Sequence, residues 1–348
     1  MNMMENQLCK FDKMTLPRVE REQLEERMIG PFGVRAVQTQ GRLRPEPECD
    51  IRTCFQRDVD RITHCKAFRR LKHKTQVFLQ PEGDHYRTRL THTLEVSRLS
   101  RTVARALRLN EDLTEAIALG HDLGHTPFGH AGERALNRIH PGGFRHYEQS
   151  LRVIDLLEHD GEGLNLCFET RIGILHHTYG SPDDSWEATT VRLCDRIAYI
   201  NHDLDDAIRA GLLTEAQVPQ RIREGCGTRN SERINCFISD LIYTSIFTGE
   251  LQMSPDTLEL FRFFHSFMYS DIYTNPIAKG EESKVDGILS ALYEYYTAHP
   301  EKLPADLQGI VETEGQERAA CDYISGMTDG YAMEKYGELF IPFAWTVK

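Results

Sequence analysis

Apolar residues recur with the period of an α-helix along most of the chain. Between residues 88 and 108, Val96, Leu99, Val103 and Leu107 follow one another at intervals of three or four residues, so they share one helix face. Comparable stretches cover residues 110–124, 146–159, 168–178, 187–210, 231–248, 255–270, 281–298 and 315–336. The pattern predicts an all-α (mainly α) fold.

Local signals predict where the central helices begin and end. Asn110 is a good N-cap, and the two acidic residues after it favour the first turn of a helix. That helix is expected to run to Gly124. Thr126 and Pro127 then have the residue types of an N-cap and a first helical position, so they predict the start of the next helix.

Three regions follow from these patterns. Residues 1–50 mix Pro, Gly and charge without sustained periodicity, which predicts a loop-like N-terminal arm. Residues 51–250 are expected to form the main helical domain, and residues 251–348 a C-terminal helical lobe packed on it. Period-two alternation is nearly absent, and the sequence TQVFL at 75–79 is the one short strand candidate.

Composition limits the class of protein. The chain has 348 residues, of which 40% are hydrophobic and 27% charged, so it has enough apolar residues for a substantial core. No apolar run approaches the roughly 20 residues that span a bilayer, and the N-terminus lacks the apolar segment of a secretory signal. The nine cysteines are scattered without a CxxC pair, which predicts reduced thiols and a cytoplasmic location.

The formal net charge of −12 argues against general binding to nucleic acid or to an anionic membrane. The cations are unevenly placed, because residues 61–108 contain twelve Lys or Arg against three acidic residues. Solvated helix faces would explain part of this segment. The remainder favours a site for a small, highly charged anion.

Four residues form a candidate metal set. His92 lies four residues before Val96 on the inward helix face, the His121–Asp122 pair follows, and Asp195 lies in a later helix-like stretch. Taken alone, each of these residues is as typical of a satisfied core histidine or of a solvated helix face as it is of a metal ligand. Together they offer two imidazoles and two carboxylates, a donor set that suits a divalent ion such as Mn, Mg, Fe, Ni or Zn.

A dense histidine cluster, which also contains His146, adds candidates for acid-base chemistry. His125 and His130 are not required by the metal set, and imidazoles titrate near neutral pH. Glu133 lies about one helical turn after His130 and is expected to orient it. Arg89 lies one turn before His92, where its guanidinium suits phosphate oxygens.

The order His, His-Asp, Asp resembles the signature of the HD superfamily of metal-dependent phosphohydrolases. Several longer segments, among them YRTRLTHTLEVSRLSR, GHDLGHTPFGHAGERAL and DRIAYINHDLDDA, resemble the bacterial deoxyguanosine triphosphate triphosphohydrolase-like (dNTPase) family over roughly residues 50–335. The resemblance implies an HD-domain helical fold. It also implies hydrolysis of a deoxynucleoside triphosphate to deoxynucleoside and inorganic triphosphate, with a divalent metal ion and, commonly, a homo-oligomer.

The resemblance also assigns expected roles to residues. It implies metal ligation by His92, His121, Asp122 and Asp195; catalytic roles for His125, His130 and Glu133; and substrate binding by Arg89, Gln76, Arg196, Tyr199 and Asp203. Two alternatives stay open. One is another HD phosphohydrolase that acts on nucleoside monophosphates, cyclic nucleotides or guanosine polyphosphates. The other is a non-catalytic nucleotide-binding HD protein.

Overall fold

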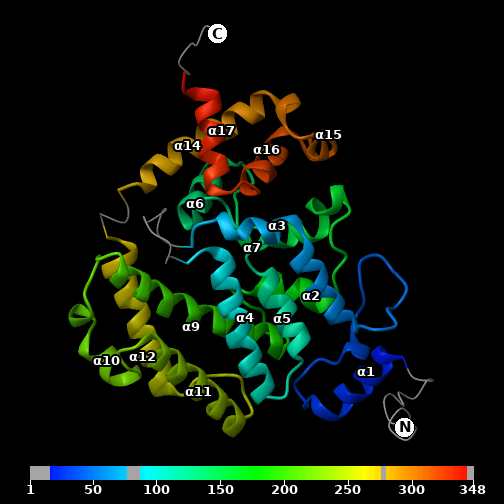
Figure 1. Ribbon diagram of the computed structural model, residues 1–348, viewed down its shortest axis with the longest axis vertical. Helices are drawn as coiled ribbons and strands as arrows, with labels where there is room; N and C mark the ends of the chain where they lie inside the picture. The colour runs from blue at the N-terminus through cyan, green and yellow to red at the C-terminus, as the bar shows by residue number, and fades with distance from the viewer. Residues whose placement is uncertain (1–15, 77–86, 276–279, 343–348) are drawn as a thin grey trace, which may run out of the picture.

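The computed structural model describes residues 16–76, 87–275 and 280–342, and within these ranges the protein is helical (Figure 1). Its longer helices are α1 (Pro17–Met28), α2 (Cys54–His64), α3 (Lys66–Arg70), α4 (Arg89–Ala106), α5 (Glu111–Gly120), α6 (Gly129–Ile139), α7 (His146–Arg152), α8 (Phe168–His176), α9 (Trp186–Arg209), α10 (Gln220–Cys226), α11 (Asn230–Thr248), α12 (Pro255–Phe267), α14 (Glu282–Ala298), α15 (Gln308–Glu314), α16 (Gln316–Ser325) and α17 (Asp329–Phe340). The described residues contain no strand, so the predicted all-α fold is confirmed.

The strand candidate at 75–79 is reduced to one residue pair. Thr75 forms an isolated antiparallel bridge with Thr88. Residues 77–79 lie outside the described residues.

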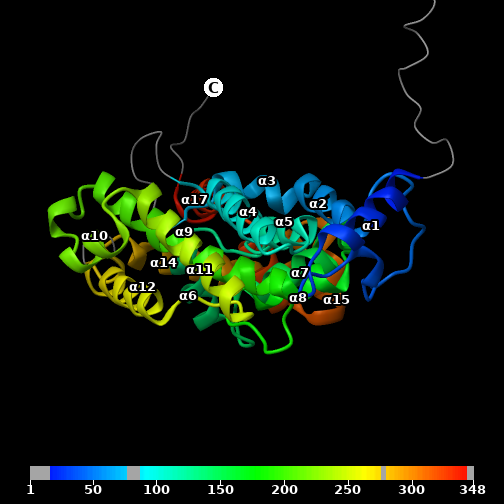
Figure 2. The same ribbon diagram turned by 90° about the horizontal axis from the view of Figure 1, so that it is seen from below.

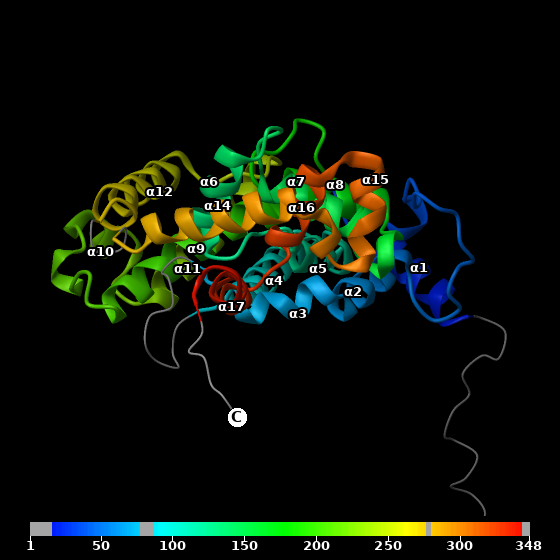
Figure 3. The same ribbon diagram turned by 90° about the horizontal axis from the view of Figure 1, so that it is seen from above.

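Helices α4, α5 and α9 form the centre of the molecule. Each packs on the other two, and α2 and α8 cover the far side of α5. The inward stripe of α4 is as predicted at His92, Val96 and Val103, which are buried. Leu99 is half-buried, and Leu107 lies just beyond the end of the helix. A second core joins α9 to α10, α11 and α12, which lie together at one end of the molecule, opposite α1 (Figures 2 and 3).

The C-terminal helices pack on the central domain through α6. Buried side chains of α6, α14 and α16 form one apolar core, and α17 packs on α14 beside it (Figure 1). Thr328 separates α16 from α17, because its side chain accepts a hydrogen bond from the backbone N–H of Tyr331 and so caps α17. The single helix expected over 315–336 is therefore two helices. The division of the chain into domains stays a prediction.

Helix α5 begins as predicted but ends earlier. The Asn110 side chain accepts hydrogen bonds from two backbone N–H groups of the first turn. The helix ends at Gly120, and not at Gly124, because Ser150 of α7 intervenes. Its hydroxyl donates to the carbonyl of His121 (2.7 Å) and accepts from the N–H of Gly124 (2.9 Å). His121 and Asp122 thus lie in a turn directly after the helix.

The predicted start of the next helix is also wrong. Thr126 and Pro127 precede α6, which begins at Gly129 after Phe128, and Phe128 adopts the left-handed region with φ of 62°. The Thr126 hydroxyl does not cap the helix but donates to the carbonyl of Gly129 (2.9 Å). A bulky residue rarely adopts positive φ without support from tertiary contacts, so this turn is held by its neighbours.

The N-terminal region is more ordered than its sequence suggests. The expectation of a loop is wrong for α1, which lacks an apolar stripe but begins with Pro17 and carries an Arg18–Glu22 ion pair one turn apart. The segment after α1 is held by buried carboxylates. Glu25 accepts from the N–H of Ala36 (2.7 Å), and Glu187 of α9 accepts from the N–H of Val34 (2.9 Å).

No helix in the described ranges is long and apolar enough to cross a membrane. The eight cysteines that the structure describes are all unpaired.

Glu187 generates a pH prediction. Its side chain is fully buried, and burial raises its pKa from 4.5 to about 7 although two backbone N–H groups donate to it. A carboxyl whose pKa is raised on folding stabilises the fold most below about pH 4.5, and this contribution is lost as the pH rises through about 7. Glu187→Gln keeps an acceptor oxygen but cannot ionise. The free energy of unfolding of the variant, relative to wild type, should therefore rise between about pH 5 and pH 8, by up to roughly 3 kcal/mol.

Urea unfolding at several pH values measures this difference. Glu20→Gln, at an exposed position of α1, supplies a matched control for the same substitution outside the core. A pH-independent difference for Glu187→Gln would contradict the assignment.

Candidate active site

The predicted metal set is brought together where α4, α9 and the end of α5 meet. His92 Nε2 lies 3.0 Å from Asp195 Oδ1, and His121 Nε2 lies 3.8 Å from the same oxygen. The Nδ1–H of His121 donates to the carbonyl of Ala118 (2.7 Å), which leaves its Nε2 lone pair directed at the cluster. Burial would raise the pKa of Asp195, but the hydrogen bond from His92 and the nearby histidines lower it to about 2. Donor atoms of His92, His121 and Asp195 all lie within 4.8 Å of one another.

Asp122 is the fourth member of the set, and Arg89 holds it in place. Its Oδ2 accepts from Arg89 Nη1 (2.7 Å) and lies 3.6 Å from His121 Nε2, with all three side chains buried. Burial opposes ionisation, but Arg89 and the histidines hold the pKa of Asp122 well below its usual range. Arg89 was expected to act on phosphate; the structure adds this bond to Asp122 and a second to the carbonyl of Gln76 (3.2 Å).

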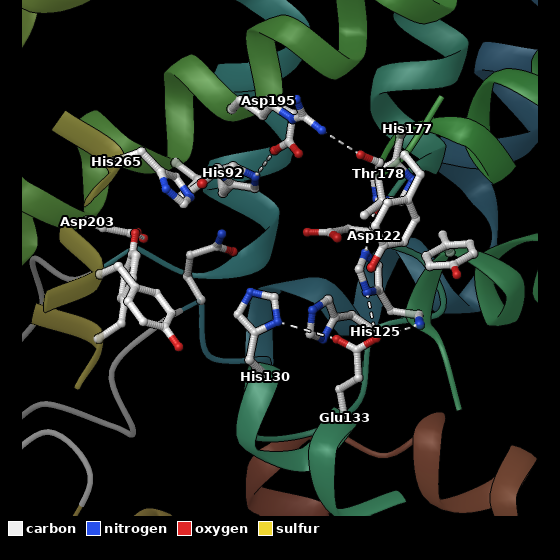
Figure 4. Close-up of a pocket in the computed structure, with 18 of the residues that line it drawn as sticks. His92, Asp122, His125, His130, Glu133, His177, Thr178, Asp195, Asp203 and His265 are labelled. Carbon is white, nitrogen blue, oxygen red and sulfur yellow. Dashed lines mark hydrogen bonds and ion pairs between the residues drawn. The ribbon is translucent and has the colours of Figure 1, made fainter. Parts of the chain in front are cut away.

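His130, on the first turn of α6, and Glu133, about one turn later, line the opposite side of the cavity (Figure 4). The His130 side chain is 62% exposed, and its Nδ1 lies 3.4 Å from Glu133 Oε2. Glu133 binds His146 more closely, at 2.9 Å from both the backbone N and Nδ1. Burial would raise the pKa of Glu133, but the hydrogen bonds from the two histidines hold it well below its usual value. Glu133 therefore orients His146 as well as His130.

His125 is fully enclosed beside this pair. Neither of its ring nitrogens has a hydrogen-bond partner among the described residues, and its ring stacks on that of His146 with centroids 4.8 Å apart. Burial and the neighbouring Arg89 and His146 hold the pKa of His125 well below its usual value. The ring is therefore neutral at pH 7.

A second buried acid lies at the far end of the cavity, away from His177 (Figure 4). Asp203 of α9 accepts a hydrogen bond from the Tyr273 hydroxyl at 2.5 Å. Burial raises the pKa of Asp203 to about 7, although the bond from Tyr273 opposes this. Tyr199 lies one turn earlier on α9, and His265 of α12 contacts its ring edge to face.

One cavity of about 1130 Å³ connects these groups. Of the predicted site residues, the following line it: Gln76, Arg89, His92, Asp122, His125, His130, Glu133, Asp195, Arg196, Tyr199 and Asp203. His121 is buried and is not among the lining residues.

The cations of the cavity come mostly from outside the basic segment. Arg89 is the only described cation of residues 61–108 that lines the cavity; Arg134, Arg145, Arg196 and Arg262 supply the others. Arg87 instead binds acidic residues of α4 and α9. The expectation that the basic segment gathers at the site is therefore wrong except for Arg89.

Sequence reasoning missed His177 and gave no role to His146. His177 directly follows α8, and its Nδ1–H donates to the carbonyl of Ile174 (2.7 Å), as His121 does to Ala118. Burial, together with His121 and His146, lowers the pKa of His177 to about 3. The one available signal was the pair of adjacent histidines at 176–177.

The C-terminal helices hold the loop that carries the histidines. Asp329, the first residue of α17, accepts hydrogen bonds from the backbone N–H of Phe128 (2.8 Å) and of Thr75 (2.9 Å), and from the Thr75 hydroxyl. Lys74 donates to the carbonyl of Ser325 (2.8 Å) and to that of His125. These bonds support the left-handed Phe128 immediately before α6.

A helical fold with a buried His, His-Asp, Asp cluster defines a protein of the HD class. Residues 89–200 match the HD domain family, and residues 251–338 match the phosphohydrolase-associated domain. The chain belongs to the deoxyguanosinetriphosphate triphosphohydrolase-like family of HD phosphohydrolases.

Three proteins with this family name illustrate the similarity. The one from Caldanaerobacter subterraneus subsp. tengcongensis is 51% identical over 93% of this chain and 96% of its own length. The one from Desulfatibacillum aliphaticivorans is 46% identical over 92% and 98%, and the one from Clostridium tetani is 43% identical over 95% and 98%. Membership of the HD class implies a divalent metal ion, for which the buried histidine and aspartate cluster supplies donors.

Removing Asp329 tests whether its hydrogen bonds to Phe128 and Thr75 hold the segment before α6 in place. Asp329→Ala leaves the buried N–H of Phe128 and the two donors of Thr75 without their acceptor, and each unsatisfied buried group costs about 1–3 kcal/mol. The thermal midpoint should fall, while metal content should persist, because the candidate ligands do not touch Asp329. Calorimetry and elemental analysis measure the two effects. Glu334→Ala, at an exposed position of the same helix, should change neither the thermal midpoint nor the metal content. If Asp329→Ala lowers the thermal midpoint no more than this control does, the hydrogen bonds of Asp329 do not hold the segment before α6.

Proposed function

We propose that the protein hydrolyses deoxynucleoside triphosphates, either dGTP or several dNTPs, to deoxynucleoside and inorganic triphosphate in a metal-dependent reaction. The observation that supports this most is the single cavity. It joins a buried histidine and aspartate cluster, a histidine-glutamate pair and several arginines to an end lined by tyrosines. A nucleoside triphosphate has the same succession of phosphates, sugar and base. The predicted homo-oligomer stays a prediction.

The metal would be held by His92, His121, Asp122 and Asp195. The donor set fits a divalent transition ion, because the Nδ1 bond of His121 frees its Nε2 and both carboxylates are ionised. When bound, such an ion supplies Lewis-acid polarisation of a phosphoryl oxygen and lowers the pKa of a coordinated water.

The arginines would bind the triphosphate. Arg145 and Arg196 line the same cavity as the candidate metal ligands, and Arg196 is held by a hydrogen bond to the carbonyl of Thr178 (2.8 Å). Arg89 would both hold the metal ligand Asp122 and bind phosphate. It donates to Asp122, while its Nε has no partner among the described residues. Guanidinium groups offset phosphate charge and bind its oxygens in pairs.

His130 is the better general acid for the leaving 5′-oxygen. Its side chain is 62% exposed at the cavity wall, and its Nδ1 lies 3.4 Å from Oε2 of Glu133, which can orient the ring. His125 is enclosed, and its lowered pKa keeps the ring neutral at pH 7, a form that is a poor general acid. We therefore assign proton donation to His130, with Glu133 as the residue that positions it.

The sugar would bind near Asp203. The carboxyl is already engaged by the Tyr273 hydroxyl, and Tyr199 lies on the same face of α9. These groups offer hydrogen bonds to a 3′-hydroxyl, and the enclosed position of Asp203 leaves little room for an additional 2′-hydroxyl. Gln76, with its Oε1 unpartnered among the described residues, lines the same cavity.

Product analysis tests the proposed reaction. We expect incubation with each dNTP and Mn or Mg to release deoxynucleoside and inorganic triphosphate, and the matching ribonucleotides to react more slowly. Chromatography of nucleosides and phosphates separates these products. Release of nucleoside monophosphate and pyrophosphate, or hydrolysis only of a cyclic nucleotide, a monophosphate or a guanosine polyphosphate, would assign a different HD activity. No reaction with any nucleotide would favour a binding protein.

A pair of histidine variants tests the acid. His130→Ala should keep metal and nucleotide binding but reduce kcat roughly 100- to 10,000-fold, the usual contribution of a positioned acid. Glu133→Gln should lose less, because Glu133 positions the imidazole and donates no proton to substrate. Steady-state kinetics with binding measured separately give these values. If His125→Ala abolishes turnover while His130→Ala keeps a normal kcat, the acid is His125.

A further inference from the structure

The cavity continues beyond the candidate metal set, on the side away from Asp203. Figure 4 shows Asp203 on one side of this set, and His177 and Thr178 on the other. Tyr179 follows Thr178 in the chain, and it lines the cavity together with Tyr147 of α7. We call the part of the cavity next to these two tyrosines the distal end. A sugar bound near Asp203 would lie at the opposite end.

Helix α12 approaches the distal end, because it runs in the same direction as α9 along the cavity. The π-helical turn that continues α12 ends at Tyr273, which donates a hydrogen bond to Asp203 of α9. His265, eight residues before Tyr273, contacts Tyr199, which lies four residues before Asp203. Residues of α12 that precede His265 therefore lie further along the cavity, toward the first turns of α9 and away from the proposed sugar position.

Apolar and aromatic side chains make up much of the distal end. Five apolar residues of α9, α12 and the segment before α12 line the cavity and pack on one core: Leu193, Leu251, Met253, Leu258 and Phe261. The rings of Tyr147 and Tyr179 meet edge to face with centroids 5.6 Å apart, and Tyr179 is 75% exposed. An aromatic ring exposed at a cavity wall offers a face on which a planar group can stack. Such a surface suits a nucleobase better than it suits strongly hydrated phosphate groups.

Three arginines accompany these side chains. Arg145 lies two residues before Tyr147, and Arg262 belongs to the part of α12 that precedes His265. Arg196 of α9 completes the set. All three line the cavity, and none of them forms an ion pair with a described carboxylate. Their charge is therefore available to a polyphosphate chain that leads from the metal set to the distal end.

The volume of the cavity also favours a ligand larger than one nucleotide. It measures about 1130 Å³, whereas pockets that bury one drug-sized ligand typically enclose about 300–1,000 Å³. A dNTP with its sugar near Asp203 and its α-phosphate at the metal set would bring only its terminal phosphates to the arginines. The tyrosines and the apolar residues of the distal end would then contact no apolar part of the ligand.

We propose that the distal end binds a second nucleoside, attached to the terminal phosphate of the substrate, so that 5′,5′-dinucleoside polyphosphates are a further class of substrate. The proposal rests on the function proposed above, because the reacting atoms are the same. A water oxygen bonds to the phosphorus that carries the deoxynucleoside, the bond from this phosphorus to the 5′-oxygen breaks, and the 5′-oxygen takes a proton from His130. A dinucleoside triphosphate thus yields a deoxynucleoside and a nucleoside triphosphate.

The alternative is that the distal end encloses only the terminal phosphates of a dNTP. A substituent on the last phosphate would then prevent binding. A capped dNTP, in which adenosine is joined through its 5′-oxygen to the γ-phosphate, therefore distinguishes the two explanations. The cap also removes negative charge from the polyphosphate chain, so the arginines by themselves would favour the uncapped compound.

Parallel kinetics with dGTP and adenosine-capped dGTP provide the test. The full-length protein is assayed with Mn²⁺, and nucleosides and nucleotides are separated by chromatography. We expect deoxyguanosine and ATP as the first products of the capped compound. Tyr179→Ala should lower kcat/KM for the capped compound roughly 5- to 150-fold, the usual effect of removing an aromatic ring that stacks on a base, and should leave dGTP hydrolysis unchanged. If another dNTP reacts faster than dGTP, that dNTP and its capped form are used in the same way.

Two further variants serve as controls. Tyr179→Phe keeps the aromatic ring and should retain activity on the capped compound. Tyr243→Ala removes a tyrosine of α11 that is 73% exposed and is not among the lining residues of the cavity, so it should change the hydrolysis of neither compound.

Hydrolysis of dGTP without hydrolysis of the capped compound would overturn the second nucleoside site. An equal loss on both compounds in Tyr179→Ala, or an unchanged rate with the capped compound in that variant, would also overturn it. If neither compound reacts, the reaction proposed above fails, and calorimetry then tests the distal end separately. Tighter binding of the capped compound to wild type than to Tyr179→Ala would support the site, and equal binding to the two proteins would overturn it.

Discussion

The Asp122 carboxylate is buried at the junction of α4, α5 and α7, where an unpaired negative charge would strongly destabilise the fold. Its ionisation is offset by Arg89, which donates to it at 2.7 Å, and by the imidazole of His121. Because Arg89 begins α4 and Asp122 follows α5, the ion pair relates the ends of the two central helices. The rest of the site is built around this pair. His92 lies one turn after Arg89 on α4, and Asp195 comes to the same point from α9.

The C-terminal helices take part in the site although they contribute none of the candidate metal ligands. Asp329 and the carbonyl of Ser325 hold the segments that carry Gln76 and the histidine loop. The positive φ of Phe128 is supported by this contact, and α6 begins immediately after it with His130 on its first turn. If residues 251–338 packed less closely on residues 89–200, the cavity wall that carries His130, the proposed general acid, would therefore be affected directly.

Electrostatics of the site depend on burial more than on the number of charges. The basic segment 61–108 contributes one described cation to the cavity, since Arg87 binds carboxylates elsewhere and Lys74 binds backbone carbonyls. Burial also separates groups of the same type. It holds the pKa of His125 well below its usual value, whereas the side chain of His130 is exposed beside Glu133. His125 and His130, five residues apart, are thus suited to different chemical roles.

The sequence by itself determined the all-α fold, the inward stripe of α4 and the cap at Asn110, because helix periodicity and capping act within a few residues. It also pointed to the residues that line the cavity, because their chemical types and order are legible along the chain. Only the tertiary structure decided the end of α5 at Gly120, where Ser150 of α7 bonds the following turn, the left-handed Phe128, the bond between Arg89 and Asp122, and the meeting of His146 with His177. These features join residues far apart in sequence. Their energy comes from burial and from hydrogen bonds that exist only once the helices have packed.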